Sequence, residues 1–277
     1  MIEDKLLSKM FSLSGKTIVL TGAGGILVSE MAIAAAKCGA SSVIVDISKD
    51  SAEKVAKRIK DENHEAIAIQ CNVLDRNNLS ECCRVILDKY GKIDCLVNGA
   101  GGNRPEATTS DDLDFFDIPV EANKAVLDLN LIGTMLPCQV FGKEIAKQEN
   151  GSIVNIASIS GFRPLTRAPG YAAGKAAVIN FTKWLAVYMC QNYSSRIRVN
   201  AIAPGFFATE QNKYLLYDDA GQLTRRGQSI IAKVPQQRFG NPGELTGALI
   251  WLLSESASFC TGTVITIDGG FDAFSGV

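Results

Sequence analysis

The sequence predicts a doubly wound α/β fold, in which helices cover both faces of one parallel β-sheet. Short apolar runs rich in β-branched residues alternate with longer segments of helical periodicity along the chain. Most of the short runs are apolar at nearly every position, which is typical of strands buried on both faces. Neither an internal repeat nor a Pro- or Ser-rich linker interrupts the 277 residues. We therefore expect one domain, residues 1–277.

About seven strands are expected, followed in most cases by a helix. The candidate strands are Thr17–Thr21, Ser42–Asp46, Ala66–Cys71, Asp94–Asn98, Ser152–Ala157, Arg198–Ala203 and Thr263–Ile267. The candidate helices are Ile26–Cys38, Ser51–Glu62, Asn77–Tyr90, Asn123–Gln148, Ala172–Asn192 and Pro242–Leu253. Two stretches break the rhythm. Residues 101–122 favour a loop at the sheet edge, and residues 206–238 favour a substrate lid, since long loops in compact domains are usually functional.

Composition excludes several function classes. With 28 basic and 29 acidic residues the net charge is −1, whereas a nucleic-acid or membrane-surface binder needs a basic excess. No segment reaches the roughly 18–20 uncharged apolar residues of a membrane span, and residues 1–10 lack the apolar core of a secretory signal. The eight cysteines form no CxxC pair, which indicates buried thiols in a reducing cytoplasm. With His64 as the one histidine, neither a metal site nor Ser-His or Cys-His catalysis is expected.

The first expected strand ends in the glycine-rich turn Thr21-Gly22-Ala23-Gly24-Gly25 and leads into a helix. Glycines there let backbone N–H groups approach a phosphate at the helix N-terminus. Asp46 closes the second strand, 22 residues after Gly24, where a carboxylate accepts hydrogen bonds from a ribose diol and repels a 2′-phosphate. The turn alone fits a plain strand-to-helix connection equally well. Together with Asp46 it predicts a dinucleotide site that prefers NAD to NADP.

Tyr171 and Lys175 lie four residues apart in an expected helix, so their side chains share one face. A free tyrosine, with a pKa near 10, suits proton transfer at neutral pH poorly. An ammonium about 4 Å from the phenolate contributes about 4 kcal/mol at an effective dielectric of 20, enough to bring the pKa towards 7. Spacing alone is more typical of a surface Tyr–Lys pair, so the other motifs decide.

Taken together, six stretches resemble the short-chain dehydrogenase/reductase family across essentially the whole chain. In order they are the turn at 21–25, Cys71-Asn72-Val73, Asn98-Gly99-Ala100-Gly101, Asn130 in Leu-Asn-Leu-Ile-Gly, Ser158 placed 13 residues before Tyr171, and Pro204-Gly205 followed by Thr209. The resemblance implies a Rossmann fold and an NAD(P)-dependent oxidoreductase. It also implies a homotetramer, with the helices near 123–148 and 172–192 packing across a two-fold interface.

The resemblance also implies roles for individual residues. Tyr171 exchanges a proton with the reacting oxygen, Ser158 binds that oxygen, Lys175 holds the nicotinamide ribose and lowers the tyrosine pKa, and Asn130 holds a proton-relay water. The residues implied to contact the cofactor are Gly22, Gly24, Gly25, Ile26, Asp46, Asn72, Val73, Asn98, Ala100, Gly101, Tyr171, Lys175, Pro204, Gly205, Phe207 and Thr209.

The chain departs from the family pattern at three places. Ile26, Leu27 and Val28 fill the positions where a third glycine is usual, Asn72 replaces an aspartate, and Gly99 replaces the second asparagine of Asn-Asn-Ala-Gly. None of these changes removes a catalytic group. The altered turn implies either a different approach of the first helix to the pyrophosphate or a shift of the turn by one residue. Asn72 is expected to retain a hydrogen-bond acceptor.

The loops at the expected substrate end carry cationic and amide side chains, which suit carboxylates and hydroxyls. The candidates are Asn103, Arg104, Arg163, Arg167, Gln211 and Asn212. They favour a small polyhydroxy acid over a steroid or acyl chain. Stretches at 101–109, 141–144, 204–212 and 268–277 resemble the D-mannonate oxidoreductase (fructuronate reductase) and sugar-acid dehydrogenase subgroup.

Other activities stay open at this point. A gluconate 5-dehydrogenase or another polyol dehydrogenase fits the same residues. A non-catalytic dinucleotide-binding regulator is disfavoured because Asn130, Ser158, Tyr171 and Lys175 are all present. A sugar-nucleotide epimerase is disfavoured because the C-terminal region is too short for a separate substrate domain.

Overall fold

A computed structural model describes residues 9–209, 213–218 and 220–276. Its centre is one seven-stranded sheet in the order β3-β2-β1-β4-β5-β6-β7, with every neighbouring pair parallel. The strands are β1 (Thr17–Thr21), β2 (Ser41–Asp46), β3 (Ala66–Gln70), β4 (Cys95–Asn98), β5 (Gly151–Ile156), β6 (Ile197–Pro204) and β7 (Val264–Ile267). The predicted fold class is confirmed, and each strand lies within a few residues of its expected position.

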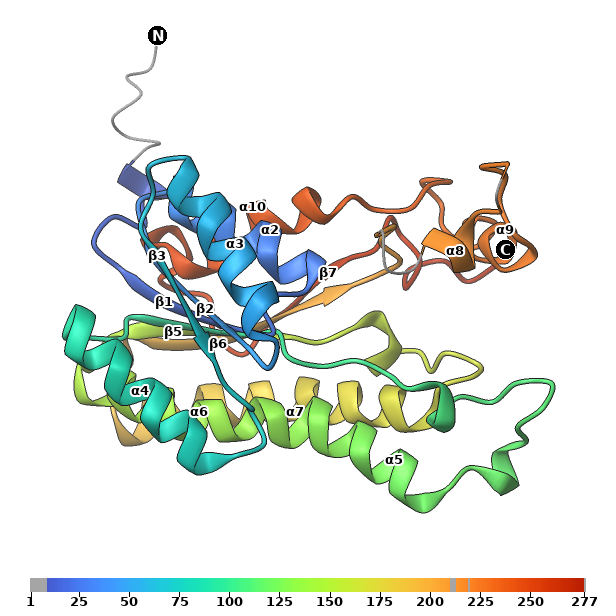
Figure 1. The fold of residues 1–277 in the computed structure, drawn as a ribbon, viewed down its shortest axis with the longest axis horizontal. Helices are drawn as coiled ribbons and strands as arrows, with labels where there is room; N and C mark the ends of the chain where they lie inside the picture. The colour runs from blue at the N-terminus through green and yellow to red at the C-terminus, as the bar shows by residue number, and fades with distance from the viewer. Residues whose placement is uncertain (1–8, 210–212, 219, 277) are drawn as a thin grey trace, which may run out of the picture.

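Helices cover both faces of this sheet (Figure 1). One layer holds α2 (Ile26–Lys37), α3 (Lys49–Asp61) and α10 (Thr246–Leu253), and the other holds α4 (Arg76–Tyr90), α5 (Val120–Leu127), α6 (Gly133–Lys147) and α7 (Pro169–Asn192). Two hydrophobic clusters divide the strand residues between the faces. Ile18 and Leu20 of β1 join the first cluster and Val19 joins the second, so the all-apolar strands feed two separate cores.

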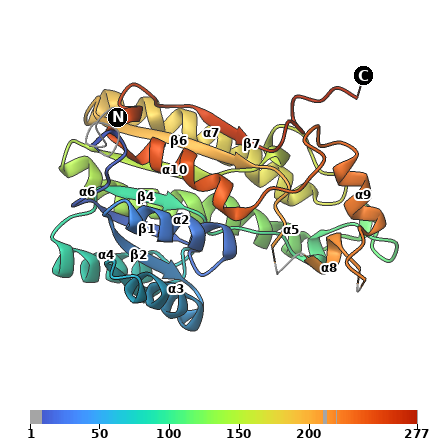
Figure 2. The ribbon, with the colours of Figure 1, turned by 90° about the horizontal axis from the view of Figure 1, so that it is seen from above.

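The chain order places the carboxyl ends of the strands at one end of the molecule. Strand order reverses between β1 and β4, which is where doubly wound sheets open a ligand crevice. The lid segment, with α8 (Lys213–Leu216) and α9 (Arg225–Ile231), lies at that same end, as does α5 (Figure 2). A backbone bridge between Phe207 and Gly240 closes the base of this segment.

The expected helix over 123–148 is interrupted in the structure. Residues Asp128–Ile132 form a π-helical turn between α5 and α6, and Asn130 lies in it. A π-turn inserts one extra residue into the helix and often marks a functional site. Side-chain periodicity does not show such an insertion, because the apolar pattern continues on both sides of it.

By length and composition alone, the helical run 120–147 could cross a membrane, although it carries charged residues such as Asp128. Half of its most apolar window is buried inside the fold. Helix α6 contacts α4, β4 and β5, and Phe141 and Ile145 are fully buried there. The apolar character of this run is therefore accounted for by the core of the protein.

Candidate active site

The glycine-rich turn meets the end of β4 at very short range. Gly22 has φ +64°, and a Cβ there would lie 2.6 Å from the Cα of Ala100. Thr21 is fully buried, and its hydroxyl accepts hydrogen bonds from the backbone N–H groups of Gly99 and Ala100 at 3.2 and 3.4 Å. A side chain at Gly22 would force the two strand ends apart. The close approach of the two strand ends therefore requires a glycine at this position.

Asp46 lies beside the same turn at the end of β2. Its Oδ2 accepts from the Gly24 N–H and its Oδ1 from the Ser48 N–H, both at 2.9 Å. A Cβ on Gly24 would lie 2.9 Å from that carboxylate. Each oxygen keeps a further lone pair, so the carboxylate retains capacity for a ribose diol.

The start of α2 offers the donors that an anion needs. The N–H of Gly25 is bonded to Gly22 O at 3.1 Å, whereas those of Ile26, Leu27 and Val28 have no partner within the described residues. Three unpaired N–H groups at the N-terminus of a twelve-residue helix suit a pyrophosphate. Together with the tight glycine turn and Asp46, the residues present fit a dinucleotide.

The other expected cofactor contacts differ in what they offer. Asn72 Oδ1 accepts from the Leu74 N–H at 3.0 Å, and Val73 is buried, so the predicted contact of Asn72 with the cofactor stays a prediction. Asn98 is only 2% exposed, and its amide nitrogen donates to Asn155 Oδ1 at 2.9 Å. Its side chain is therefore part of the interior, which limits Asn98 to a backbone contact with any cofactor.

At the opposite end of the crevice, the Gly205 N–H donates to Ile267 O at 2.8 Å next to Pro204. Phe207 is 6% exposed and lines a cavity of about 410 Å³ with Arg238, Glu244 and residues 266–270. Thr209 is partly buried. None of the three catalytic candidates on β5 and α7 lines this cavity.

Ser158, Tyr171 and Lys175 come together at the carboxyl end of β5. Tyr171 and Lys175 lie one turn apart in α7, with Lys175 Nζ 5.7 Å from the centre of the Tyr171 ring. Ser158 is hydrogen-bonded to the Tyr171 hydroxyl. Lys175 Nζ donates to Ile156 O at 2.8 Å, so the last residue of β5 fixes the ammonium. The three side chains thus face one another as the sequence predicts.

Glycines allow this close approach. A Cβ on Gly101 would lie 2.8 Å from Asn130 Oδ1 and 3.1 Å from Lys175 Nζ. A Cβ on Gly161 would lie 2.8 Å from Lys175 O. The loop after β4, the loop after β5 and helix α7 therefore meet around Lys175, although they are distant in sequence.

Burial controls the protonation of the pair. Desolvation raises the pKa of Tyr171 above its ordinary value, while its hydrogen bond with Ser158 acts in the opposite direction. Desolvation also lowers the pKa of Lys175 to about 8. The expected fall of the tyrosine pKa towards 7 is not what the structure shows, because burial of the phenol outweighs the other contributions. At neutral pH Tyr171 holds its proton and Lys175 is cationic.

Asn130 is fully buried in the π-turn. Its Nδ2 donates to Gly102 O at 2.7 Å and to Val126 O at 2.8 Å, and its Oδ1 accepts from the Gly102 N–H at 3.2 Å. The amide therefore holds the loop after β4 against α5. These hydrogen bonds show a structural role for Asn130. The proton-relay water that the resemblance implies stays a prediction.

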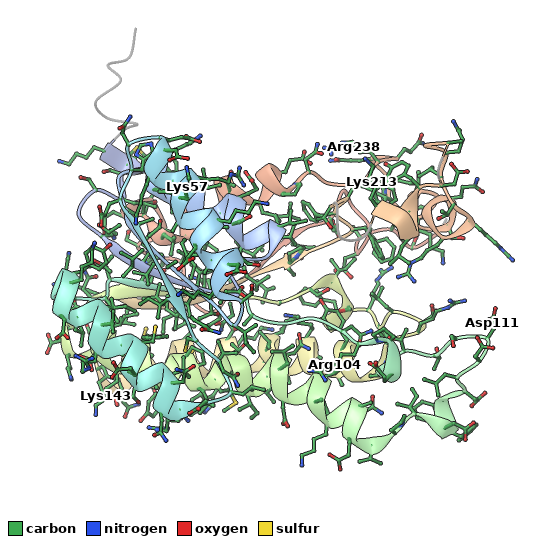
Figure 3. The ribbon with its side chains drawn as sticks, viewed as in Figure 1. Lys57, Arg104, Asp111, Lys143, Lys213 and Arg238 are labelled. Carbon is green, nitrogen blue, oxygen red and sulfur yellow. The ribbon has the colours of Figure 1, made fainter. Side chains whose placement is uncertain are left out.

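The six substrate candidates separate in the structure. The guanidinium groups of Arg104 and Arg167 make no hydrogen bond or ion pair with any described residue. The two loops are joined through the backbone, by a bond from the Thr109 N–H to Arg167 O at 2.9 Å. Arg104 lies on the α5 side of the molecule, with Lys213 on the lid side, and Asp111 marks the outer tip of the loop (Figure 3). Asn103 donates to Thr108 at 2.7 Å. Gln211 and Asn212 lie outside the described residues.

The prediction that Arg163 binds substrate conflicts with its contacts. Its Nε pairs with Asp272 at 3.2 Å and its Nη1 donates to Phe274 O at 2.9 Å. The guanidinium is thus committed to the C-terminal segment. Sequence reasoning missed this partner, although the Asp268-Gly-Gly pattern signals an ordered turn after the last strand.

Comparison with known proteins agrees with this geometry. Residues 26–272 match the family model described as enoyl-(acyl carrier protein) reductase. The uncharacterised oxidoreductase UxuB of Bacillus subtilis is 42% identical over 96% of this chain and 98% of its own length. The chain belongs to the short-chain dehydrogenase/reductase family. It is therefore an oxidoreductase of that family.

Two solved structures add detail about relatives. A protein from Haemophilus influenzae, provisionally assigned as a D-mannonate oxidoreductase and crystallised with NAD, is 41% identical with a TM-score of 0.91, covering 98% of this chain and 100% of its own. A gluconate 5-dehydrogenase from Burkholderia cenocepacia, in complex with NADP and tartrate, is 29% identical with a TM-score of 0.83, covering 97% and 99%.

Proposed function

We propose that this protein uses NAD(H) to interconvert a hydroxyl and a carbonyl group on a small polyhydroxy acid, with D-mannonate and D-fructuronate as the substrate pair. The observation that carries the proposal is the meeting of Tyr171, Ser158 and Lys175 at the carboxyl end of β5. The Haemophilus relative, with its bound NAD, supports both the cofactor and the substrate class.

The chain's own residues supply proton transfer and position. Tyr171, protonated at neutral pH, donates its phenolic proton to the carbonyl oxygen during reduction and takes it back during oxidation. Ser158 hydrogen-bonds the same oxygen as charge develops on it. The Lys175 ammonium, 5.7 Å from the centre of the Tyr171 ring, would stabilise the phenolate that remains. When bound, the nicotinamide supplies or accepts the hydride, and the glycine turn, the first turn of α2 and Asp46 would hold the dinucleotide.

The substrate class follows from the two unpartnered arginines. Arg104 and Arg167 come from adjacent loops joined by the Thr109 bond, and a guanidinium binds a carboxylate through two parallel hydrogen bonds. We propose that they hold the acid group while the lid, residues 206–238, covers the hydroxylated chain. Arg163 is not included, since its contacts lie with the C-terminal segment.

A gluconate 5-dehydrogenase activity is the second candidate. The tartrate in the Burkholderia relative favours it, because tartrate is itself a small hydroxy acid. The same relative binds NADP, whereas Asp46 in this chain would place a carboxylate against a 2′-phosphate.

One assay tests substrate and cofactor together. The purified protein is offered a panel of hexonic and ketohexonic acids, including D-mannonate, D-fructuronate, D-gluconate and 5-keto-D-gluconate, and the absorbance of the reduced nicotinamide is followed. We expect D-mannonate and D-fructuronate to give the highest kcat/KM, with NADH at least about tenfold better than NADPH. Highest efficiency on the gluconate pair would favour the second candidate. Equal efficiency with both cofactors would contradict the role of Asp46.

We also propose that the protein is a cytoplasmic homotetramer folded as one domain. An aromatic ladder on the outer face of α7 supports assembly: Phe181, Trp184 and Tyr188 stack in sequence, and Tyr193 meets Tyr188 edge-on. Trp184 is 56% exposed. Large aromatic side chains left in contact with water are typical of protein interfaces.

A further inference from the structure

The segment that follows β7, residues 268–274, has an ordered path of its own, and we call it the strap. The Asp268 carboxylate fixes it, since Oδ1 accepts from the Gly270 N–H at 2.8 Å and Oδ2 from the Asp272 N–H at 2.7 Å. A Cβ on Gly205 would lie 2.6 Å from the Asp268 Cα, so the strap begins directly beside the Pro204-Gly205 segment. From there it runs towards the end of the molecule that carries the lid (Figure 2).

The strap contacts the lid through backbone and glycine packing. Gly269 O accepts from the Gln236 N–H at 3.2 Å. Gly269 has φ +65° and Gly270 has φ +90°, and Cβ atoms there would lie 2.8 Å from Val234 and 3.1 Å from Pro235. Side chains at these two positions would therefore push the strap off the lid.

Aromatic side chains extend the same contact. The rings of Phe271 and Phe206 meet edge-to-face with centroids 5.2 Å apart. Phe274 lines a cavity of about 530 Å³ together with lid residues that include Ile231 and Val234. The lid thus contacts the strap in two places. One is at Phe206, where the lid begins, and the other is next to the end of α9.

On its other side the strap is bound to the catalytic loop, residues 159–170, which joins Ser158 to Tyr171. Arg163 forms the connection, with Nε 3.2 Å from Asp272 Oδ1 and Nη1 donating to Phe274 O at 2.9 Å. Two contacts from one planar guanidinium fix direction as well as distance. One short segment thereby contacts both the lid and the loop that joins Ser158 to Tyr171.

We propose that the strap couples the lid to the catalytic loop, and that Arg163 is a positioning residue in this link. The inference rests on the proposed function, because it concerns how that site holds its substrate. The Arg163 and Asp272 side chains are 48% and 32% exposed, so their pairing adds little to global stability. The Arg163–Asp272 pair instead affects the positions of Ser158 and the lid relative to the substrate.

The test uses Arg163→Gln, Asp272→Asn and the double variant in the full-length protein. Arg196→Gln is the control, since Arg196 is exposed and pairs with Glu149 at 4.0 Å. Steady-state kinetics on the best substrate of the panel are combined with hydrogen exchange of residues 159–168 and 225–236. We expect each single variant to raise KM about fivefold, to change kcat less than about twofold, and to speed exchange in both segments. The double variant should be no worse than either single one, and the control should match wild type.

A charge exchange, Arg163→Asp with Asp272→Arg, should recover part of the lost KM, because the ion pair is rebuilt with reversed polarity. The proposal is overturned if Arg163→Gln raises KM while Asp272→Asn leaves KM and exchange unchanged, since Arg163 would then bind substrate directly. It is equally overturned if no variant alters exchange. Should no sugar acid be turned over, the proposed function fails, and hydrogen exchange alone still decides whether the strap couples the two segments.

Discussion

Lys175 is 4% exposed and donates one hydrogen bond, to Ile156 O, within the described residues. Burying an ammonium among few acceptors opposes its charge, which is why its pKa lies near 8 and well below that of a free lysine. The protein retains this unfavourable charge where the proposed chemistry needs it, beside the Tyr171 phenol. The desolvation of the Lys175 ammonium is therefore an unfavourable contribution to the stability of the folded protein without ligand.

This cost predicts how stability changes with pH. The folded-state pKa of Lys175 is lowered, so between about pH 8 and 10.5 the unfolded state binds more protons than the native state, and wild-type stability gains with rising pH from this residue. In Lys175→Met the gain should vanish, and at pH 7 the variant should be more stable than wild type by about 1–3 kcal/mol. Urea unfolding at pH 7, 8, 9 and 10 measures both effects. A variant less stable than wild type at pH 7 would show that the ammonium is not destabilising.

At the residue scale, the sequence predicts well which side chains meet at the end of β5, because their spacing along the chain is regular. Ser158, Tyr171 and Lys175 meet as expected, since a strand end and one helix turn place them. The side chains of Arg163 and Asn98, two predicted ligand contacts, bond to other parts of the protein, and Asn98 keeps only its backbone for a ligand. Their partners are 109 and 57 positions away, at Asp272 and Asn155, and nothing local in the sequence indicates such pairings.

At the scale of elements, two departures from the family pattern compensate each other. A Cβ on Gly99 would lie 2.4 Å from Val28 Cγ2 in α2 and 2.9 Å from Thr21 O. Val28 thus fills the space that a side chain after β4 would occupy. Val28 stands where glycine is usual, and Gly99 stands where asparagine is usual. The larger side chain in α2 is thus matched by the smaller residue after β4.

This steric match predicts coupled stabilities. Gly99→Ala should lower the free energy of unfolding by about 1–3 kcal/mol through overpacking, and Val28→Ala alone should cost about 1 kcal/mol or more through a small cavity. In the double variant the loss should be at least about 1 kcal/mol smaller than the sum, because the missing methyl groups make room for the new one. The remaining contact with Thr21 O keeps the recovery partial. Strictly additive losses in urea unfolding would refute the steric link.

The elements themselves follow from the sequence in type and order, because strands buried on both faces and amphipathic helices leave clear patterns. The π-turn at Asp128–Ile132 does not, since it adds one residue without breaking the apolar periodicity. The expected lid, residues 206–238, lacks a regular pattern in the sequence, because α8 and α9 inside it are too short, at four and seven residues, to leave one.

At the scale of the whole molecule, the proposed assembly depends on the outer face of α7. The ladder through Trp184 and Tyr188 has no counterpart within the described chain that would cover it, and Val187 beside it is 56% exposed. A second copy of the same face would bury these side chains in an interface with two-fold symmetry.

Trp184→Glu should therefore lower the molar mass in solution from that of a tetramer to that of a smaller species, because a buried carboxylate would oppose association. Light scattering after size-exclusion chromatography measures this mass. Phe116→Ser, at a side chain 89% exposed on the loop before α5, is the matched control and should leave the mass unchanged. A Trp184→Glu protein with the wild-type mass would place the interface elsewhere.

The measurement that bears most directly on the proposed function is turnover of Tyr171→Phe beside its affinity for NADH. Loss of the phenolic proton donor should lower kcat by about a thousandfold or more, while fluorescence titration should give an NADH dissociation constant within about threefold of wild type. Tyr188→Phe, which removes a hydroxyl from the same helix outside the site, should leave both unchanged. Equal turnover by Tyr171→Phe and wild type would contradict the assignment of this tyrosine as the group that transfers the proton.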